Sequence, residues 1–130
     1  MSDNIFIFKN KLKYRDNTLK FIDYLYCDKD NNNDDKFFIN NYNIYYKDNE
    51  SSLFTFNIDL EFNIPLEDCE LHIYINNKRM YSYYDDNIKN IKYSTIIPLK
   101  KDYFFNIVIK SKNLEDYNII ENSSLIITKI

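Results

Sequence analysis

The sequence predicts an all-β fold, an antiparallel β-sandwich of about ten short strands. Apolar and polar residues alternate with a period of two along much of the chain, whereas helical periodicity is weak. Hydrophobic residues make up 45% of the 130 residues and charged residues 28%, which is typical of a globular domain. Turn signals separate the apolar stretches at the spacing expected of a sandwich or barrel. We therefore expect a single domain over residues 1–130.

The composition is strongly biased. The chain has no Gly, Trp, Ala or Gln and is rich in Asn, Ile, Lys, Asp, Tyr and Phe. The favoured residues have A/T-rich codons, so the bias indicates an A/T-rich genome. Without Gly, every turn that needs a positive φ must use Asn or Asp. Phosphate-binding Gly loops, dinucleotide fingerprints and G-x-S-x-G nucleophile elbows are excluded.

The first third of the chain is the least regular part. The apolar run Ile5–Phe8 and the β-rich stretch Leu19–Tyr26 each predict a strand. An acidic, Asn-rich loop covers Asp28–Asp35, and further strands are expected at Lys36–Ile39 and Asn43–Tyr46.

The clearest strand lies in the middle of the chain, at Leu53–Phe62. Its apolar residues share one face of the strand, and its polar residues share the other; they are Phe54, Phe56, Ile58, Leu60 and Phe62 against Thr55, Asn57, Asp59 and Glu61. Alternation resumes at Cys69–Ile75, after which Asn76-Asn77 predicts a tight hairpin turn that returns through Arg79–Tyr83.

The last third predicts three more strands, at Tyr93–Leu99, Tyr103–Lys110 and Ser124–Ile130. Pro98 indicates that the first of them is an edge strand or ends there. The connections are a loop at Asp85–Asn87, a turn at Lys100–Asp102 and a polar loop at Lys112–Asp116.

Three predicted strands are apolar on both faces: Ile5–Phe8, Phe104–Ile109 and Leu125–Ile130. A sandwich strand is normally wet on one face unless something covers it. One interpretation is that large side chains extend onto the surface. The other is that these strands share one sheet whose outer face packs against another subunit. The second interpretation predicts an interface formed by Ile5, Phe6, Ile7, Phe8, Phe104, Val108, Ile126 and Ile130.

Four segments carry a resemblance to a known fold family: Ser52–Ile58, Cys69–Asn77, Tyr93–Ile109 and Asn122–Ile130. They resemble the tumour necrosis factor (TNF)-like jelly roll, and within it the complement-type (C1q-like) globular heads and the related heads of bacterial and viral fibres. The resemblance covers residues 36–130, whereas residues 1–35 supply N-terminal strands and the acidic loop. It implies a jelly-roll sandwich of ten strands and a compact homotrimer.

In that family the first, last and two middle strands face the three-fold axis. The resemblance therefore implies that the three doubly apolar strands belong to this inner sheet, with Leu53–Phe62 as the fourth.

His72 is the only histidine, and we expect it to face the surface. Cys69 lies three residues away on the same strand, so the two side chains point to opposite faces and do not form a metal site. No strained-serine motif supports a Ser-His-Asp triad. The sequence predicts no enzyme activity, no catalytic or metal-binding residue and no cofactor.

The start of the chain, Met1–Asn4, lacks the features of a secretory signal. We therefore expect Cys27 and Cys69 to be buried free thiols, although they could pair if their strands meet. Asp28–Asp35 begins like a calcium loop, but an EF-hand would need Gly and Glu where Asn33 and Ile39 stand. A solvated loop is expected, with a looser calcium site as the alternative.

The net charge of −3 does not favour binding to nucleic acid or to an anionic membrane surface. No apolar run is long enough to cross a membrane.

Our first hypothesis is a non-enzymatic adhesion or structural module. It would be a homotrimeric head or capsid-associated protein of an A/T-rich virus, located in the virion or host cytoplasm. Its loops would bind a host-surface receptor or virion component through Tyr83, Tyr84, Asn87 and Tyr117.

The alternative hypothesis is a monomeric carbohydrate-binding sandwich. In it, exposed tyrosines such as Tyr81, Tyr83 and Tyr84 would stack on sugar rings.

Overall fold

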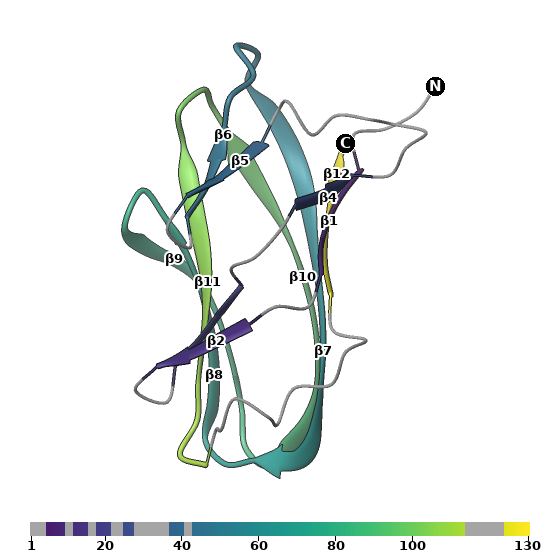
Figure 1. The fold of residues 1–130 in the computed structure, drawn as a ribbon, viewed down its shortest axis with the longest axis vertical. Helices are drawn as coiled ribbons and strands as arrows, with labels where there is room; N and C mark the ends of the chain where they lie inside the picture. Colours follow the sequence, from purple (N-terminus) through teal and green to yellow (C-terminus); the bar gives the residue numbers. More distant parts are fainter. Residues whose placement is uncertain are drawn as a thin grey trace.

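The computed structural model is a sandwich of two antiparallel β-sheets, seen edge-on as two layers in Figure 1. It describes the backbone of residues 5–9, 12–15, 18–21, 25–27, 37–40, 43–113 and 124–130, and the side chains of residues 37–38, 43–113 and 125–130. Among these residues there is no helix with the length and hydrophobicity of a membrane span. The all-β, antiparallel fold class predicted by the sequence is confirmed.

The described residues form twelve strands. They are β1 (Ile5–Lys9), β2 (Leu12–Arg15), β3 (Thr18–Phe21), β4 (Leu25–Cys27), β5 (Phe37–Asn40), β6 (Asn43–Tyr46), β7 (Ser52–Leu66), β8 (Cys69–Ile75), β9 (Lys78–Asp85), β10 (Ile88–Leu99), β11 (Phe104–Lys110) and β12 (Ser124–Lys129).

One sheet has five strands in the order β10-β7-β12-β1-β4. The other has seven strands arranged around β11. On one side β11 pairs with β8, which pairs with β9; on the other side it pairs with β6 near Phe104 and with β3 near Lys110. The outer partners β5 and β2 extend from β6 and β3. Figure 1 shows β7, β10, β12 and β1 in one layer and β8, β9 and β11 in the other.

The hydrophobic core fills the space between the sheets. The five apolar residues of β7 predicted to share one face are all buried, with at most 2% of each side chain exposed. Across the sandwich, the Phe56 and Phe105 rings pack edge to face with centroids 4.9 Å apart. Phe37, Tyr46 and Phe54 extend this aromatic packing at one end. Such offset ring pairs add about 0.5–1.5 kcal/mol beyond the apolar area that they bury.

Every described residue with a positive φ is Asn or Asp, as the lack of Gly predicts. The two hairpin residues Asn76 and Asn77 have φ values of 52° and 66°, which suits the tight turn between β8 and β9. Asp68, Asn87 and Asp102 adopt positive φ in the other turns. The predicted connections at Asp85–Asn87 and Lys100–Asp102 are confirmed.

Several strand boundaries differ from the prediction. β10 begins at Ile88, and β7 continues to Leu66. The stretch Leu19–Tyr26 contains two strands, β3 and β4, which belong to different sheets. Periodicity identifies extended chain, but it does not show where a chain leaves one sheet for the other.

The expectation that the three doubly apolar strands share one sheet is wrong for Phe104–Ile109. β1 and β12 are neighbours in the five-stranded sheet, whereas β11 is central in the opposite sheet. Its outer face is covered by cross-strand neighbours within the same chain. The Phe104 ring packs against Tyr45 at 5.1 Å, and Val108, which is 6% exposed, lies opposite His72. The double apolarity of β11 thus reflects its central position.

Candidate functional site

The outward face of the five-stranded sheet is the first candidate surface. Along β7, β10 and β12 the residues that alternate with the buried core residues point away from the core. In register across the sheet, Thr55 lies between Ile96 and Thr128, and Asn57 lies between Ser94 and Ile126. The outward direction of the polar residues of β7 agrees with the predicted alternation.

This face has an apolar end and a polar end. At the apolar end Leu53 is 50% exposed, Ile96 is 55% exposed and Ile130 is 66% exposed. Pro98 lies opposite Leu53, and the Ile130 N–H donates to the Leu53 carbonyl. We call Leu53, Ile96, Pro98, Ile126 and Ile130 the apolar patch.

The polar end lies further along the same strands. There Lys92 is the register partner of Asp59, next to Glu61 and Asn90. Between the two ends, the Ser94 hydroxyl donates to the Asn57 amide oxygen. The sheet thus presents apolar and hydrogen-bonding groups to whatever covers it.

The predicted interface residues divide between the two sheets. Ile126 and Ile130 belong to the apolar patch. Ile5, Phe6, Ile7 and Phe8 form most of β1, which is paired with β12, but their side chains lie outside the described residues. Phe104 and Val108 lie on the seven-stranded sheet and cannot belong to the same surface.

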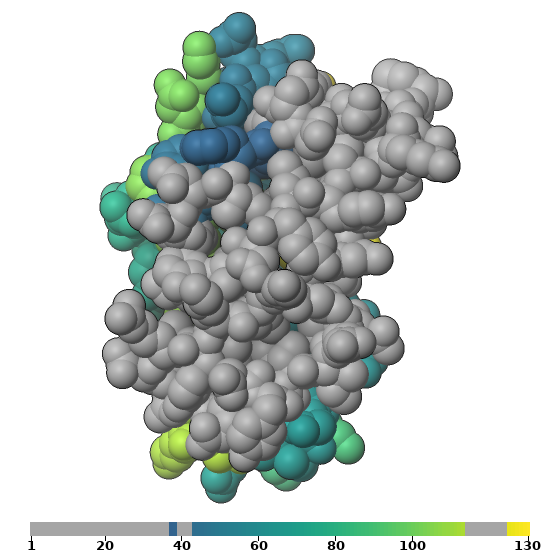
Figure 2. Space-filling view, viewed as in Figure 1, coloured from purple at the N-terminus to yellow at the C-terminus, as the bar shows by residue number. Residues whose placement is uncertain are grey.

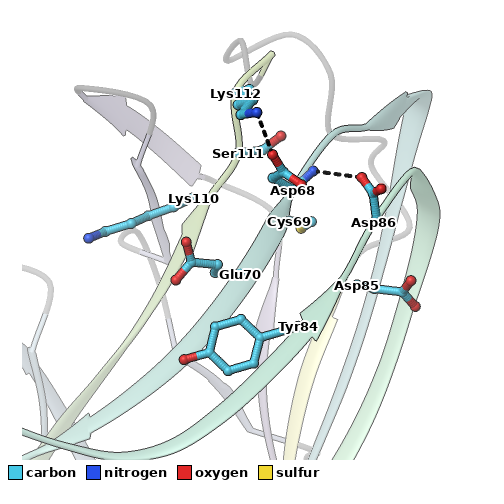
Figure 3. A pocket seen from close by; sticks show the side chains of 9 residues that line it. All are labelled: Asp68, Cys69, Glu70, Tyr84, Asp85, Asp86, Lys110, Ser111 and Lys112. Carbon is cyan, nitrogen blue, oxygen red and sulfur yellow. Dashed lines mark hydrogen bonds and ion pairs between the residues drawn. The ribbon is translucent and has the colours of Figure 1, made fainter.

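The second candidate surface is an open cavity of about 840 Å³ at one end of the seven-stranded sheet. It lies where β8 begins and where β9 and β11 end. The lining residues, labelled in Figure 3, are Asp68, Cys69, Glu70, Tyr84, Asp85, Asp86, Lys110, Ser111 and Lys112. The volume lies within the range of about 300–1,000 Å³ that is usual for small-ligand sites.

Hydrogen bonds hold the rim of this cavity. The Lys112 ammonium lies 2.6 Å from a carboxylate oxygen of Asp68, and the Asp68 N–H donates to Asp86 Oδ1 (Figure 3). The hydrogen bond and charge of Asp68 raise the pKa of Lys112. Ser111 Oγ and the Lys112 N–H both donate to the Glu67 carbonyl. These bonds join the β7–β8 turn to the end of β11. The two segments lie at the lower end of the molecule, where their atoms are teal and yellow-green in Figure 2.

The expectation of a surface-facing His72 is wrong. The residue points to the outer face of β8, as predicted, but none of it is exposed. Its Nδ1 lies 2.7 Å from Ser82 Oγ, and its Nε2 lies 2.9 Å from Glu70 Oε1. The Tyr84 ring packs edge to face on the imidazole at 5.6 Å. Large neighbours on adjacent strands bury the ring, and alternation alone does not show this.

The contacts of His72 resemble a catalytic triad only in composition. Both imidazole nitrogens are engaged, and the ring is sealed beneath its neighbours. A general base must reach the proton that it removes. The arrangement instead fixes the positions of the side chains around it.

Cys69 is a buried free thiol, which confirms the prediction for this residue. Burial, with smaller contributions from the charges of Asp85 and Glu70, raises the pKa of the thiol from 9.0 to about 12. The thiol is therefore protonated and unreactive at neutral pH. Cys27 lies on β4 in the opposite sheet, and its side chain is outside the described residues.

The predicted loop residues occupy different environments. Tyr84 lines the cavity and is 59% exposed. Tyr83 points to the other face of β9, where it packs on Tyr93 and its hydroxyl donates to Asp85. Asn87 is the positive-φ residue of the β9–β10 turn. Tyr117 lies outside the described residues.

Two further expectations concern tyrosines and metals. Tyr81, like Tyr83, is partly buried against the core, so Tyr84 is the exposed ring among the three tyrosines proposed to stack on sugars. The acidic loop Asp28–Asp35 lies outside the described residues. Among those that are described, no three His, Cys, Asp or Glu side chains are grouped as metal ligands.

Two connections predicted from the sequence meet at this cavity. Asp85 and Asp86 come from the loop after β9, next to Tyr84, and Lys112 comes from the loop after β11. Asp68, Glu70 and Lys110 also line the cavity, and sequence reasoning missed all three. The signal available for Asp68 was its position in the short turn between Leu66 and Cys69, where, in a chain without Gly, a positive φ requires Asn or Asp.

Comparisons with known proteins agree with this topology. A scan against protein-family models gives no match, and a search of curated proteins gives none either. Among solved structures, murine APRIL superposes with a TM-score of 0.70 at 5% identity, covering 98% of each chain. Pika GITRL superposes with a TM-score of 0.62 at 9% identity, covering 98% of this chain and 95% of that one.

Both proteins are ligands of the TNF family. Identities this low establish the fold and nothing finer. The chain therefore has the TNF-like jelly-roll fold, and the fold implied by the resemblance in the sequence is confirmed.

Proposed function

We propose that this protein is a non-enzymatic binding module that assembles as a homotrimer through the outward face of its five-stranded sheet. The apolar patch is the observation that carries the proposal. Its residues come from β7, β10 and the end of the chain, and three of them are at least half exposed. Contiguous exposed apolar surface on a folded protein usually marks a contact with another protein.

A second copy of the chain is the partner that best fits this face. A symmetric assembly buries the same apolar patch in every subunit, so no unrelated partner is needed to cover it. The TNF-like fold supports this choice because, in the family that the sequence resembles, the corresponding sheet faces the three-fold axis. The side chains of β1, next to β12, would extend the interface.

Light scattering on the purified chain tests the assembly. We expect a mass of three times the 15.9 kDa chain. Ile96→Asp should convert the trimer to single chains, because it places an unpaired charge in a desolvated interface. Met80→Asp is the matched control. Met80 is 52% exposed, close to the 55% of Ile96, but it lies on the seven-stranded sheet, away from the proposed interface. A wild-type mass of one chain would overturn the proposal.

Binding of a partner would use surfaces that assembly leaves free. The seven-stranded sheet and its turns, including Tyr84 and Asn87, remain accessible when the opposite sheet is covered. Tyrosine and asparagine suit such a role because they combine amphipathic contact area with adaptable hydrogen bonding. We propose that a receptor or an assembly partner binds here.

The viral part of the hypothesis rests on composition. The lack of Gly, Trp, Ala and Gln supports an A/T-rich source, and a large DNA virus is one such source. A capsid-associated or fibre-head role, in the virion or the host cytoplasm, stays a prediction. Identifying the chain in purified particles by mass spectrometry would test it.

A further inference from the structure

One row of side chains forms the outer wall of the cavity at the end of the seven-stranded sheet. Lys110, Glu70 and Tyr84 are register partners on β11, β8 and β9, and so they project from the same face. In Figure 3 the Glu70 carboxylate lies between Lys110 and the Tyr84 ring, whereas Asp85 points away from both. An ammonium, a carboxylate and an exposed aromatic ring therefore stand side by side in a cavity.

The buried imidazole of His72 holds two members of this row. It hydrogen-bonds the Glu70 carboxylate at 2.9 Å and packs edge to face on the Tyr84 ring at 5.6 Å. Ser82, the register partner of His72 on β9, in turn holds the imidazole through its hydroxyl, 2.7 Å from Nδ1. A wholly buried histidine with both nitrogens engaged gives Glu70 and Tyr84 fixed positions. Fixed polar and aromatic groups reduce the entropy lost on binding a ligand.

The chemistry of the lining groups favours a particular ligand class. The carboxylates of three lining residues, two ammonium groups and the Tyr84 hydroxyl are available at the cavity, whereas the Asp85 carboxylate points away and Ser111 Oγ already donates to the Glu67 carbonyl; the three carboxylates belong to Asp68, Glu70 and Asp86. Sugar hydroxyls both donate and accept hydrogen bonds, so they match such a mixture, and the apolar face of a pyranose ring stacks on an aromatic ring.

The charges disfavour the competing ligands. The excess of carboxylates repels sulfated or sialylated glycans, and a compact cation would lack ligands, because the described residues hold no group of three acidic, His or Cys side chains that could bind one. A neutral sugar meets neither penalty.

We propose that this cavity is a binding site for neutral hexose-containing saccharides, with the Tyr84 ring as the stacking platform and Glu70 and Lys110 as hydrogen-bonding partners. His72 is a positioning residue that does not touch the ligand. The proposal deepens the partner-binding part of the proposed function. It does not require the trimer, because the cavity and the apolar patch lie on opposite sheets.

The experiment uses the full chain on a glycan array that carries neutral, amino, sialylated and sulfated glycans. We expect binding to neutral hexose glycans and little to the acidic ones. The strongest neutral glycan is then titrated by calorimetry. Tyr84→Ala should weaken binding at least about tenfold and Glu70→Gln about fivefold. Tyr45→Ala is the matched control on the same sheet, outside the cavity, and should bind like wild type.

Several results would overturn the proposal: no neutral glycan bound at about 10 mM, a preference for acidic or amino glycans over neutral ones, or binding that Tyr84→Ala and Glu70→Gln leave unchanged. If Tyr84→Ala does not fold, Lys110→Ala replaces it, because Lys110 is exposed on the same row. Light scattering on the same sample separates the two proposals. A trimer that binds no glycan contradicts the saccharide site alone, and a single chain that binds glycan contradicts the trimer alone.

Discussion

His72 and Ser82 join two neighbouring strands on the outer face of the seven-stranded sheet, with Nδ1 and Oγ 2.7 Å apart and the imidazole wholly buried. The two residues are also direct register partners on β8 and β9. β9 has no other described strand partner, since it pairs with β8 alone. This side-chain bond therefore adds to the only described ladder that holds β9 and the cavity wall.

Removing the Ser82 hydroxyl should destabilise the fold. Ser82→Ala leaves one imidazole nitrogen buried without its partner, and we expect a loss of about 1–3 kcal/mol in the free energy of unfolding. Urea denaturation measures it. Tyr83→Phe is the control, because it also removes a hydroxyl that bonds a side chain on β9, but that bond is exposed; its effect should stay within about 0.5 kcal/mol. Equal effects would show that the His72 contact is not stabilising.

The edge-to-face contact between Phe56 and Phe105 links the two sheets. Phe56→Ala creates a cavity in the fully buried core, and we expect it to cost about 3–5 kcal/mol. The same substitution at Phe38, which is 47% exposed, should cost about 1 kcal/mol. Thermal unfolding distinguishes the two variants. A tolerated Phe56→Ala would contradict the assignment of Phe56 to the core.

The β8–β9 hairpin tests the use of Asn in place of Gly. Asn77 has a φ of 66°. Asn77→Ala should destabilise the protein by about 1 kcal/mol, because a Cβ without a hydrogen-bonding amide is disfavoured in this conformation. Asn77→Gly should be neutral or stabilising, since Gly adopts positive φ without a steric penalty. Chemical denaturation of both variants checks the order, and a more stable Asn77→Ala would refute the turn geometry.

The thiol of Cys69 gives the stability a pH dependence. Its pKa is about 12 in the folded chain, against 9.0 ordinarily. Above pH 9 the unfolded chain loses this proton while the folded chain keeps it, so stability falls as the pH rises from 9 towards 12. Below pH 9 this contribution is fully present.

Urea denaturation at pH 8 and pH 10.5 measures the effect. The wild type should lose about 2 kcal/mol more than Cys69→Ala over this interval, because the unfolded thiol titrates near pH 9 and the folded one near pH 12. The difference between the two proteins removes the contributions of Tyr and Lys titration. In the native state at pH 8, iodoacetamide should modify Cys69 far more slowly than after unfolding. An equal loss in both proteins would contradict a shifted thiol.

The candidate site was only partly predictable. Tyr84 and Asn87 were identified because Tyr and Asn gather in a loop segment, and the structure places Tyr84 in the cavity. Glu70 and Lys110 carried no such signal, because each is an ordinary polar residue on an alternating strand. Their meeting depends on the pairing of β8 with β11, between segments about forty residues apart.

Local chemistry determined which segments are strands and which of their faces enter the core. Alternation in Leu53–Phe62 and Cys69–Ile75 is decided within a few residues, because side chains project to opposite sides of an extended backbone. The Asn and Asp turns are equally local, since positive φ is a property of one residue.

Tertiary structure alone decided the partner of each strand. It placed β11 in the sheet opposite β1 and β12, split Leu19–Tyr26 between two sheets, and buried His72. Any two strands can form the same backbone hydrogen bonds, whatever their sequences. The alternation pattern of one strand therefore does not predict which strand pairs with it. The neighbour is selected by packing across the whole sandwich, which depends on residues far apart in the chain.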